Sequence, residues 1–206
     1  MIEVAKVDAA TLRETYRARK LALFDTLRFS RAPTRAVHSV LRQLAALADE
    51  TLVALWERAG FSGAPALLAV GGFGRGELFP YSDVDVLVLL PESHATCIDP
   101  ACVEAFIGQC WDAGLEIGSS VRTVGECLAE AAKDVTVQTA LIESRLITGD
   151  KKLYAAFRKQ FFAELDPRAF FAAKSQEMRH RHHKYDDTPY ALEPNCKESP
   201  GGLRDL

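Results

Sequence analysis

Two aspartates stand one residue apart in an apolar stretch, within AVGGFGRGELFPYSDVDVLVLL (Ala69 to Leu90). In a strand, alternation puts Asp83 and Asp85 on one face and Val84 and Val86 on the other. Two ionised carboxylates in one small volume repel each other and lose hydration, so they require a cation or a shared proton. Mg²⁺ meets both needs, because it takes one or two carboxylates and completes its shell with water and phosphate oxygens. The pattern indicates phosphate chemistry; a solvent-facing strand-edge pair, or acids that cap a neighbouring helix, is the alternative.

A Gly-Gly pair precedes the aspartates, at the end of the apolar run ALLAV. Without a Cβ atom, Gly71 and Gly72 allow a tight turn and close approach of the backbone to a ligand, and their N–H groups can cradle a triphosphate. Arg75 offers a fork of donors to phosphate. Ser82 either donates to a phosphate or caps the turn.

The glycine segment does not fit two common phosphate-binding motifs. GGFGRGE is not a Walker A loop, since no Gly-Lys-Ser/Thr follows, and it lacks the G-x-G-x-x-G spacing of a dinucleotide fold. Gly74 and Gly76 are expected to keep the segment after the turn flexible.

Helices are expected before these residues. Charged, helix-favouring residues run from about Ala9 to Leu27, and a break at Arg28–Ala36 contains a proline. In the helix that follows, which ends near Gly60, apolar residues recur at steps of three and four, which predicts one buried stripe.

Three strands are expected to hold the site, namely ALLAVGG, VDVLVLL closed by Pro91, and LEIGSSVRTV. DPACVEAFIGQCWDAG predicts a helix with Asp99 as its N-cap and Pro100 at its first position. From Gly125 to about Tyr185 almost everything is helical in pattern. Strands between helices predict an α+β fold, a small mixed sheet flanked by helices, with N-terminal helices and a C-terminal helical extension.

Composition narrows the class of protein. The chain has 206 residues, is 48% hydrophobic and carries a net charge of -3, which fits one domain or a domain with an appendage. With 25 basic and 28 acidic residues, non-specific nucleic-acid binding is not favoured, although a local basic groove stays open. No apolar run is long enough for a bilayer and no signal-peptide layout is present, so a cytoplasmic protein without membrane association is expected. Five cysteines without paired short spacings fit neither a disulfide framework nor a zinc site.

A strand is followed by Gly-Gly, and the next strand carries S-D-h-D-h, where h is an apolar residue. This order resembles the signature of the DNA polymerase beta nucleotidyltransferase superfamily. The longer string VGGFGRGELFPYSDVDVLVLL resembles more narrowly the bacterial PII uridylyltransferase/uridylyl-removing enzyme family. Three further segments share that resemblance, namely Trp111–Leu128, Thr139–Asp150 and Glu193–Leu206. Together they cover most of the chain from Ala66 onward.

The resemblance implies a polymerase beta-like core and roles for the residues above. Gly71 and Gly72 would hold the triphosphate of UTP, and Asp83 and Asp85 would hold Mg²⁺ as catalytic metal ligands. One ion would neutralise the β- and γ-phosphates while another helps an acceptor oxygen attack the α-phosphorus, with pyrophosphate leaving in line. The acceptor in the family is a tyrosine hydroxyl of the PII nitrogen-regulatory protein.

A third carboxylate from a later strand is usual in the superfamily, and Glu116 is the candidate. The alternative makes Glu116 an outward-facing strand acid paired with Arg122. Arg122 is then either that partner or a triphosphate contact.

The terminal NCKESPGGLRDL places basic residues around a Pro-Gly-Gly turn. Lys197 and Arg204 either reach phosphates or are held in surface pairs by Glu198 and Asp205, and a mixed role is expected. The histidine-rich run RHRHHK is interpreted as a solvated helix face, since no carboxylates or cysteines support a metal site. Cys196 has no evident base beside it, which argues against a nucleophile.

Three segments are expected: N-terminal helices over 1–60, a nucleotidyltransferase core over 61–130 and a helical extension over 131–206. The resembled family continues into a phosphohydrolase domain and two glutamine-sensing domains, so the chain is expected to be an N-terminal fragment. Two other functions stay open, a related adenylyltransferase and a nucleotide-binding regulatory fragment without turnover.

Overall fold

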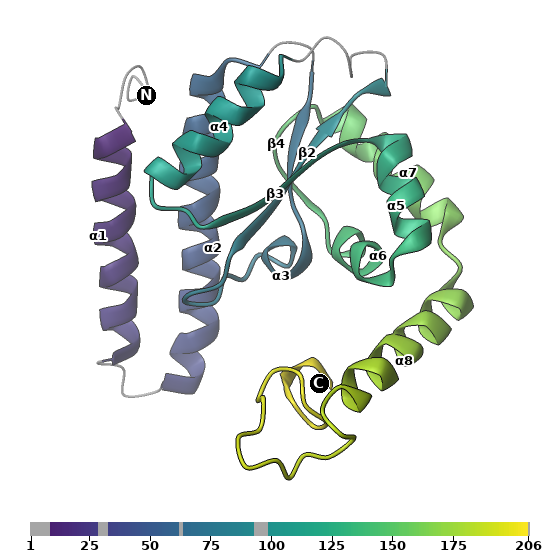
Figure 1. Ribbon diagram of the computed structural model, residues 1–206. Helices are drawn as coiled ribbons and strands as arrows, with labels where there is room; N and C mark the ends of the chain where they lie inside the picture. Colours follow the sequence, from purple (N-terminus) through teal and green to yellow (C-terminus); the bar gives the residue numbers. More distant parts are fainter. Residues whose placement is uncertain (1–8, 29–32, 62–63, 93–98, 206) are drawn as a thin grey trace.

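The computed structural model describes residues 9–28, 33–61, 64–92 and 99–205. Its centre is a four-stranded mixed sheet with the strand order β3-β2-β1-β4 (Figure 1). Helices cover both faces, which confirms the expected α+β fold. The elements in chain order are α1 (Ala9–Arg28), α2 (Pro33–Ala59), β1 (Ala66–Ala69), α3 (Gly71–Gly74), β2 (Val84–Leu90), α4 (Pro100–Asp112), β3 (Ile117–Thr123), α5 (Val124–Lys133), α6 (Val135–Ile142), β4 (Arg145–Gly149), α7 (Lys151–Glu164), α8 (Pro167–His183) and the short 3₁₀ helix η2 (Leu203–Asp205).

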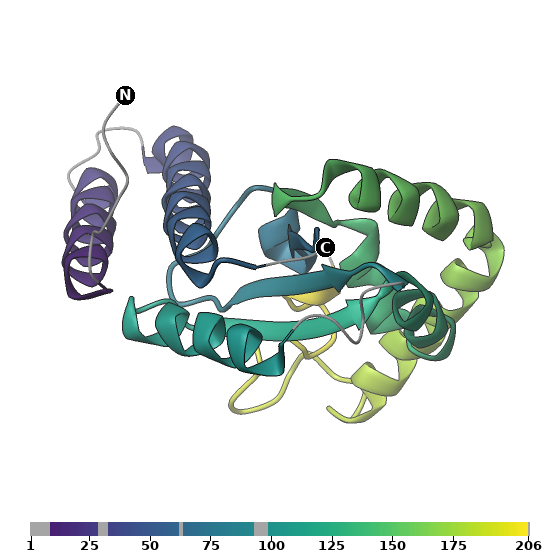
Figure 2. The ribbon, with the colours of Figure 1, turned by 90° about the horizontal axis from the view of Figure 1, so that it is seen from above.

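The sheet separates two hydrophobic cores. Helices α1, α2 and α4 pack on one face against alternate residues of β2, including Val84, Val86 and Val88. Helices α5, α6 and α7 pack on the other face, where Leu87 and Leu89 point. From above, α1 and α2 (purple and blue) stand at one end of the sheet and α7 and α8 (green) at the other (Figure 2).

The apolar stripe expected in the second helix is confirmed. It buries Val40, Leu44, Leu47, Leu52 and Leu55 almost completely on one side of α2. Burial of a side chain of this size contributes roughly 1.5–3 kcal/mol, so α2 is a principal anchor of the sheet.

Strand β2 runs antiparallel to β1 and parallel to β3. A parallel neighbour needs a crossover, and α4 provides it. The Asp99 side chain accepts a hydrogen bond from the Ala101 backbone N–H at 2.9 Å, with Pro100 at the first helical position, as the sequence predicts.

One strand departs from the expected helical pattern. Arg145–Gly149 forms β4, antiparallel to β1, a strand that the expectation of an almost entirely helical pattern from Gly125 to about Tyr185 did not include. Gly149 has φ +95°, and a Cβ there would meet the Pro65 carbonyl oxygen at 2.3 Å. Glycine at this position therefore permits the close approach of the two chain segments.

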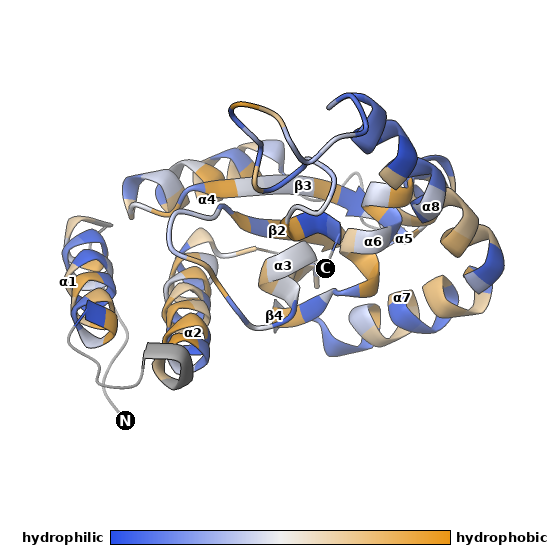
Figure 3. Cartoon of the chain, turned by 90° about the horizontal axis from the view of Figure 1, so that it is seen from below, coloured by the Kyte–Doolittle hydropathy of each residue, from blue (hydrophilic) through white to orange (hydrophobic). Residues whose placement is uncertain are grey.

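Beyond α8, residues 184–205 are mostly non-helical and turn back beneath α3 toward the core (Figure 1). Helix α8 itself is largely hydrophilic (Figure 3), in keeping with its exposed position. Among the helices of the described ranges, none combines the length and apolar character needed to cross a bilayer. Cys110 and Cys127 are buried free thiols, Cys196 is exposed, and Cys97 lies outside the described residues.

Candidate active site

Asp85 lies on β2, and Asp83 lies just before the strand begins. Val84 and Val86 are buried in the opposite core, at 2% and 1% exposure, whereas both aspartates are exposed. The predicted alternation is therefore confirmed. The Asp85 side chain shares its face of the sheet with Leu87 and Leu89, beneath α6.

Two glycines border the Asp85 carboxylate. Gly118 is the register partner of Asp85 on β3, and a Cβ at Gly118 would lie 2.6 Å from Asp85 Oδ1. A Cβ at Gly71 would lie 3.6 Å from Asp85 Oδ2. The Asp85 side chain thus occupies space that Gly118 leaves free. The sequence did not reveal this role of Gly118, because only strand pairing shows which residue faces Asp85.

Desolvation and then the neighbouring Asp83 raise the pKa of Asp85 above its usual range. Both causes disfavour the ionised carboxylate, and a bound cation would reverse them. Within the described ranges, no group of three or more His, Cys, Asp or Glu side chains is arranged to hold a metal ion. The donor set at this point is therefore two carboxylates, which suits a hard divalent ion that keeps water or phosphate oxygens as its other ligands.

The Gly-Gly turn begins α3 directly after β1. Gly71 has φ +57°, a backbone conformation that favours glycine, and the first N–H groups of the helix have no acceptor within it. Gly74 was expected to keep the segment flexible, but it is tightly packed. A Cβ at Gly74 would lie 1.9 Å from the Glu143 carbonyl oxygen. Its small size allows α3 to pack against the end of α6.

A cavity of about 550 Å³ opens beside the turn, and we call it the basic cavity. Six residues predicted to bind nucleotide line it, namely Gly71, Gly72, Arg75, Ser82, Lys197 and Arg204. The structure adds residues of α6 and α8, chiefly Thr136, Thr139, Glu143, Lys174, Glu177 and Arg181. Five basic side chains from α3, α8 and the C-terminal segment thus surround one space, and their roles in nucleotide binding stay predictions.

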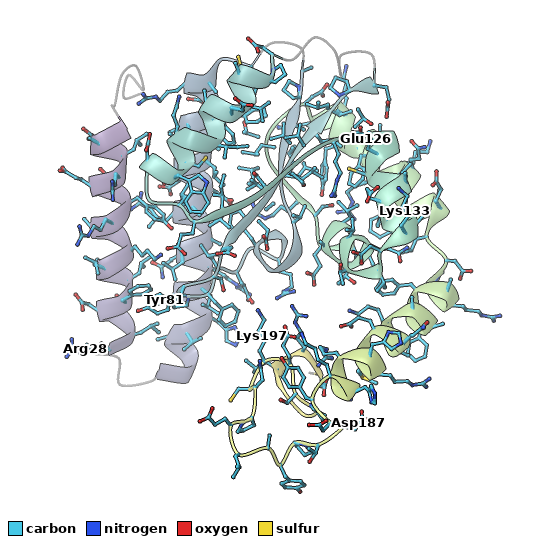
Figure 4. All side chains as sticks on the ribbon, in the orientation of Figure 1. Arg28, Tyr81, Glu126, Lys133, Asp187 and Lys197 are labelled. Carbon is cyan, nitrogen blue, oxygen red and sulfur yellow. The ribbon has the colours of Figure 1, made fainter. Side chains whose placement is uncertain are left out.

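Some of these basic side chains are already paired. Arg75 Nη1 lies 2.7 Å from Glu143 Oε1, and Arg204 Nη1 lies 3.4 Å from Glu198 Oε1. Lys197 has no ion-pair partner among the described residues and reaches from the C-terminal segment toward the core (Figure 4). The expected mixed role fits this arrangement, with Arg204 held by Glu198 and Lys197 free to meet an anion.

Arg181 ties the C-terminal segment to α8. Its side chain is only 6% exposed and donates to the Glu198 carbonyl at 2.9 Å and to Asp205 at 2.7 Å. The Arg181 hydrogen bond, followed by that of His182, holds the pKa of Asp205 well below its usual range.

The interpretation of RHRHHK as a solvated face is therefore wrong for Arg181 and His182, which contact the C-terminal segment. It holds for His180 and His183, which are exposed. Asp205 pairs with α8 and not with Lys197 or Arg204, as far as the described residues show.

A second cavity, of about 380 Å³, shares Gly71 with the basic cavity and includes Asp85 in its wall; we call it the β3 cavity. Arg122 lines it together with Gly118, Ser119 and Ser120. Glu116 lines neither cavity. It precedes β3, its carbonyl accepts the Val84 N–H at 2.8 Å, and its charge raises the pKa of Tyr16, after desolvation as the larger cause.

The proposed Glu116–Arg122 pair is not formed in the described part of the chain. A third carboxylate at Glu116 stays a prediction. Of the three carboxylates, Asp85 lines the second cavity, whereas Asp83 and Glu116 line neither cavity.

The chain is similar to known proteins over the residues that form this site. The family described as "Nucleotidyltransferase domain" matches residues 64–152, a range that holds the Gly-Gly turn, both aspartates and all four strands. The fold, the site and this match define the core as a nucleotidyltransferase domain. A second family, "GlnD PII-uridylyltransferase", matches residues 169–206, which form α8 and the C-terminal segment.

Several relatives share the name "Bifunctional uridylyltransferase/uridylyl-removing enzyme". The one from Burkholderia lata is 54% identical over 199 residues, which cover 97% of this chain and 23% of that protein. The one from Cupriavidus pinatubonensis is 55% identical over 199 residues, covering 96% and 22%. The chain belongs to this family of enzymes, as its sequence motifs indicated, and it spans less than a quarter of the length of these relatives.

Proposed function

We propose that the chain transfers UMP from UTP to a tyrosine hydroxyl of a PII protein, with Mg²⁺ as the cofactor and pyrophosphate as the second product. The observation that carries this proposal is the position of Asp83 and Asp85. Asp85 lies beside the glycine turn, which also lines a cavity with five basic side chains, and the charge of Asp83 acts on Asp85. The names of the relatives support UTP and PII as the substrates.

Asp83 and Asp85 would hold the Mg²⁺. The fit rests on the desolvation of Asp85 and its repulsion by Asp83, which both raise the pKa of Asp85, and on the missing side chain at Gly118, which leaves room for the Asp85 carboxylate. Bound there, Mg²⁺ supplies charge neutralisation for the phosphates and Lewis acidity at the α-phosphorus.

The chain's own groups would bind and orient the nucleotide. Gly71, Gly72 and Lys197 line the same cavity, so the two glycine N–H groups and the Lys197 ammonium would hold the β- and γ-phosphates there. Arg75 would exchange its contact with Glu143 for a phosphate oxygen.

Transfer then requires an in-line displacement. The acceptor oxygen forms a bond to the α-phosphorus while the bond from that phosphorus to the bridging oxygen of pyrophosphate breaks. The acceptor proton is released to water. Fixed donors around the leaving pyrophosphate stabilise its developing charge without reorganisation.

The test is transfer of α-labelled UMP to PII by the chain and by the double variant Asp83→Asn, Asp85→Asn. We expect transfer to vanish in the variant while its circular dichroism is unchanged. Glu104→Gln, an exposed acid on α4 away from both cavities, is the matched control and should transfer normally. Unchanged transfer by the double variant would refute the proposal.

Nucleotide competition in this assay, together with calorimetry, separates two other functions. Labelled ATP outcompeting UTP would indicate an adenylyltransferase. Metal-dependent UTP binding in calorimetry, with no transfer even at high PII concentration, would indicate a regulatory module without turnover.

A further inference from the structure

Arg145, the first residue of β4, connects α2 to α3. Its guanidinium donates to both oxygens of the Asp49 carboxylate on α2, from Nη1 at 2.8 Å and from Nη2 at 3.1 Å. The same Nη2 donates to the Phe73 carbonyl of α3 at 3.4 Å, and the guanidinium carbon lies 5.4 Å from the centre of the Phe73 ring. One side chain thus links the long helix α2 to the short helix that contains the Gly-Gly turn.

Helix α3 depends on contacts with other elements. It has only four residues, too few for a helix to be stable by itself. The segment between α6 and β4 supports it, because the Glu143 carbonyl packs against Gly74 and Glu143 Oε1 accepts from Arg75 Nη1 at 2.7 Å. Arg145, two residues further along, contacts the Phe73 carbonyl of the same short helix. The orientation of α3 therefore depends on residues 143–145.

The contact between α2 and β4 is ionic although it is partly buried. The side chains of Arg145 and Asp49 are 32% and 27% exposed, and Arg145 Nε is buried with no hydrogen-bond partner in the described part of the chain. Packed apolar residues often stabilise a fold as much as such an ion pair does, and an unpaired buried nitrogen lowers stability further. The ion pair adds direction instead, because two N–H···O bonds fix the plane of the guanidinium.

The turn that Arg145 supports carries groups of the proposed nucleotide site. Gly71 and Gly72 line the basic cavity, and a Cβ at Gly71 would lie 3.6 Å from Asp85 Oδ2. A rotation of α3 would therefore move the glycine N–H groups relative to a bound phosphate and to Asp85. Arg145 and Asp49 line neither cavity, so an effect of this pair on the nucleotide must pass through α3.

We propose that Arg145 and Asp49 are positioning residues, and that their ion pair sets the orientation of the Gly-Gly turn toward the phosphates of the nucleotide. This inference rests on the proposed function and adds two residues that lie outside both cavities. It requires the planar guanidinium and not only a positive charge, because the guanidinium contacts Asp49 and the Phe73 carbonyl together. Arg145→Lys keeps the charge but loses the planar fork of donors.

The experiment measures the affinity of the chain for UTP and for inorganic tripolyphosphate by calorimetry, each with Mg²⁺. We expect Asp49→Asn and Arg145→Lys to bind both ligands about tenfold more weakly, by the same factor, because the turn meets the phosphates. The double variant should lose no more than either single variant, since both residues act through one contact. In transfer assays the KM for UTP should rise likewise, while the KM for PII stays unchanged.

Two controls separate positioning from stability. Glu50→Gln removes the neighbouring acid of α2, whose ion-pair partner is Arg19 on α1, and should bind both ligands as the unaltered chain does. Val103→Ala leaves a gap in the core that α2 and α4 share, away from both cavities. It should lower the melting temperature without weakening either affinity at a temperature where the variant is folded.

Unchanged affinities in Asp49→Asn and Arg145→Lys would overturn the inference. Equally weak binding by Val103→Ala, or additive losses in the double variant, would overturn it as well. Failure of the proposed function has a different sign. If the unaltered chain binds neither ligand, the proposed function and the inference fail together. If it binds UTP but leaves PII unmodified, the proposed function fails and the affinities of the variants still decide the inference.

Discussion

Asp85 and Gly118 face each other across the parallel strands β2 and β3, and the Asp85 carboxylate lies where a side chain at Gly118 would begin. The 2.6 Å separation between Oδ1 and that Cβ position is too short for a real contact. The position of the proposed metal ligand therefore depends on a glycine from another strand. Gly118 thereby acts as a positioning residue.

Gly118→Ala should lower transfer by about a hundredfold, because a displaced ligand loses its alignment with the α-phosphorus. The fold should persist, since the end of the Asp85 side chain can rotate away. Steady-state transfer rates and thermal melting measure the two effects. Gly108→Ala on α4, where nothing lies within 4 Å, is the control and should stabilise the helix by about 0.5–1 kcal/mol.

Gly74→Ala should act on stability instead. The new methyl group would meet the backbone carbonyl of Glu143, which cannot rotate away, so we expect a loss of about 1–3 kcal/mol in the free energy of unfolding. Urea denaturation measures it. A variant as stable as the unaltered chain would contradict the tight packing of α3 on α6.

Asp85→Asn should raise the melting temperature of the metal-free chain while it abolishes transfer. The asparagine removes a charge that desolvation and Asp83 disfavour. Added Mg²⁺ should stabilise the unaltered chain and not the variant. Melting curves with and without Mg²⁺ check this, and a lower melting temperature for the metal-free variant would speak against strain between the two carboxylates.

The stability difference between the unaltered metal-free chain and Asp85→Asn should depend on pH, with a defined sign. The pKa of Asp85 is raised in the folded state, so the folded state holds the proton more tightly than the unfolded state. As pH rises above about 4, the usual aspartate range, the metal-free chain should lose stability relative to Asp85→Asn. Urea titrations between acidic and neutral pH measure the gap, which should widen and then level off.

Arg181→Gln should release the C-terminal segment from α8. The variant loses the hydrogen bonds to Glu198 and Asp205, so trypsin should cleave sooner at Lys197 and Arg204. UTP binding should weaken by about tenfold, because Lys197 is no longer held over the basic cavity. Arg179→Gln, an exposed neighbour on the same helix, is the control and should match the unaltered chain in both measurements.

The contact between the C-terminal segment and α8 should depend on pH, because Asp205 takes part in it. Its pKa is depressed in the folded state, first by Arg181, so its stabilising effect is present above the usual aspartate range and declines as pH falls below about 4. Proteolysis with an acid-active protease should therefore release the segment progressively below that pH. Equal protection at all acidic pH values would exclude Asp205 as the link.

The site was only partly visible in the sequence. The alternation around Asp83 and Asp85, the glycine turn and the capped helix after Asp99 follow from patterns within a few residues. Strand β4 was missed because five residues beside a helical pattern carry little periodicity of their own, and pairing with β1 decides their conformation. Arg181 was misread because a charged helix face looks the same whether it meets water or another segment.

The sequence by itself determined the family, the two carboxylates on one face of a strand and the turn beside them, because side-chain periodicity and glycine act over neighbouring residues. Only the tertiary structure decided that Gly118 makes room for Asp85, that α8 and the C-terminal segment bring Lys174, Arg181 and Lys197 to one cavity, and that a second cavity lies beyond Asp85. These relations join residues far apart in the chain, and packing of the whole sheet and its helices determines which of them meet.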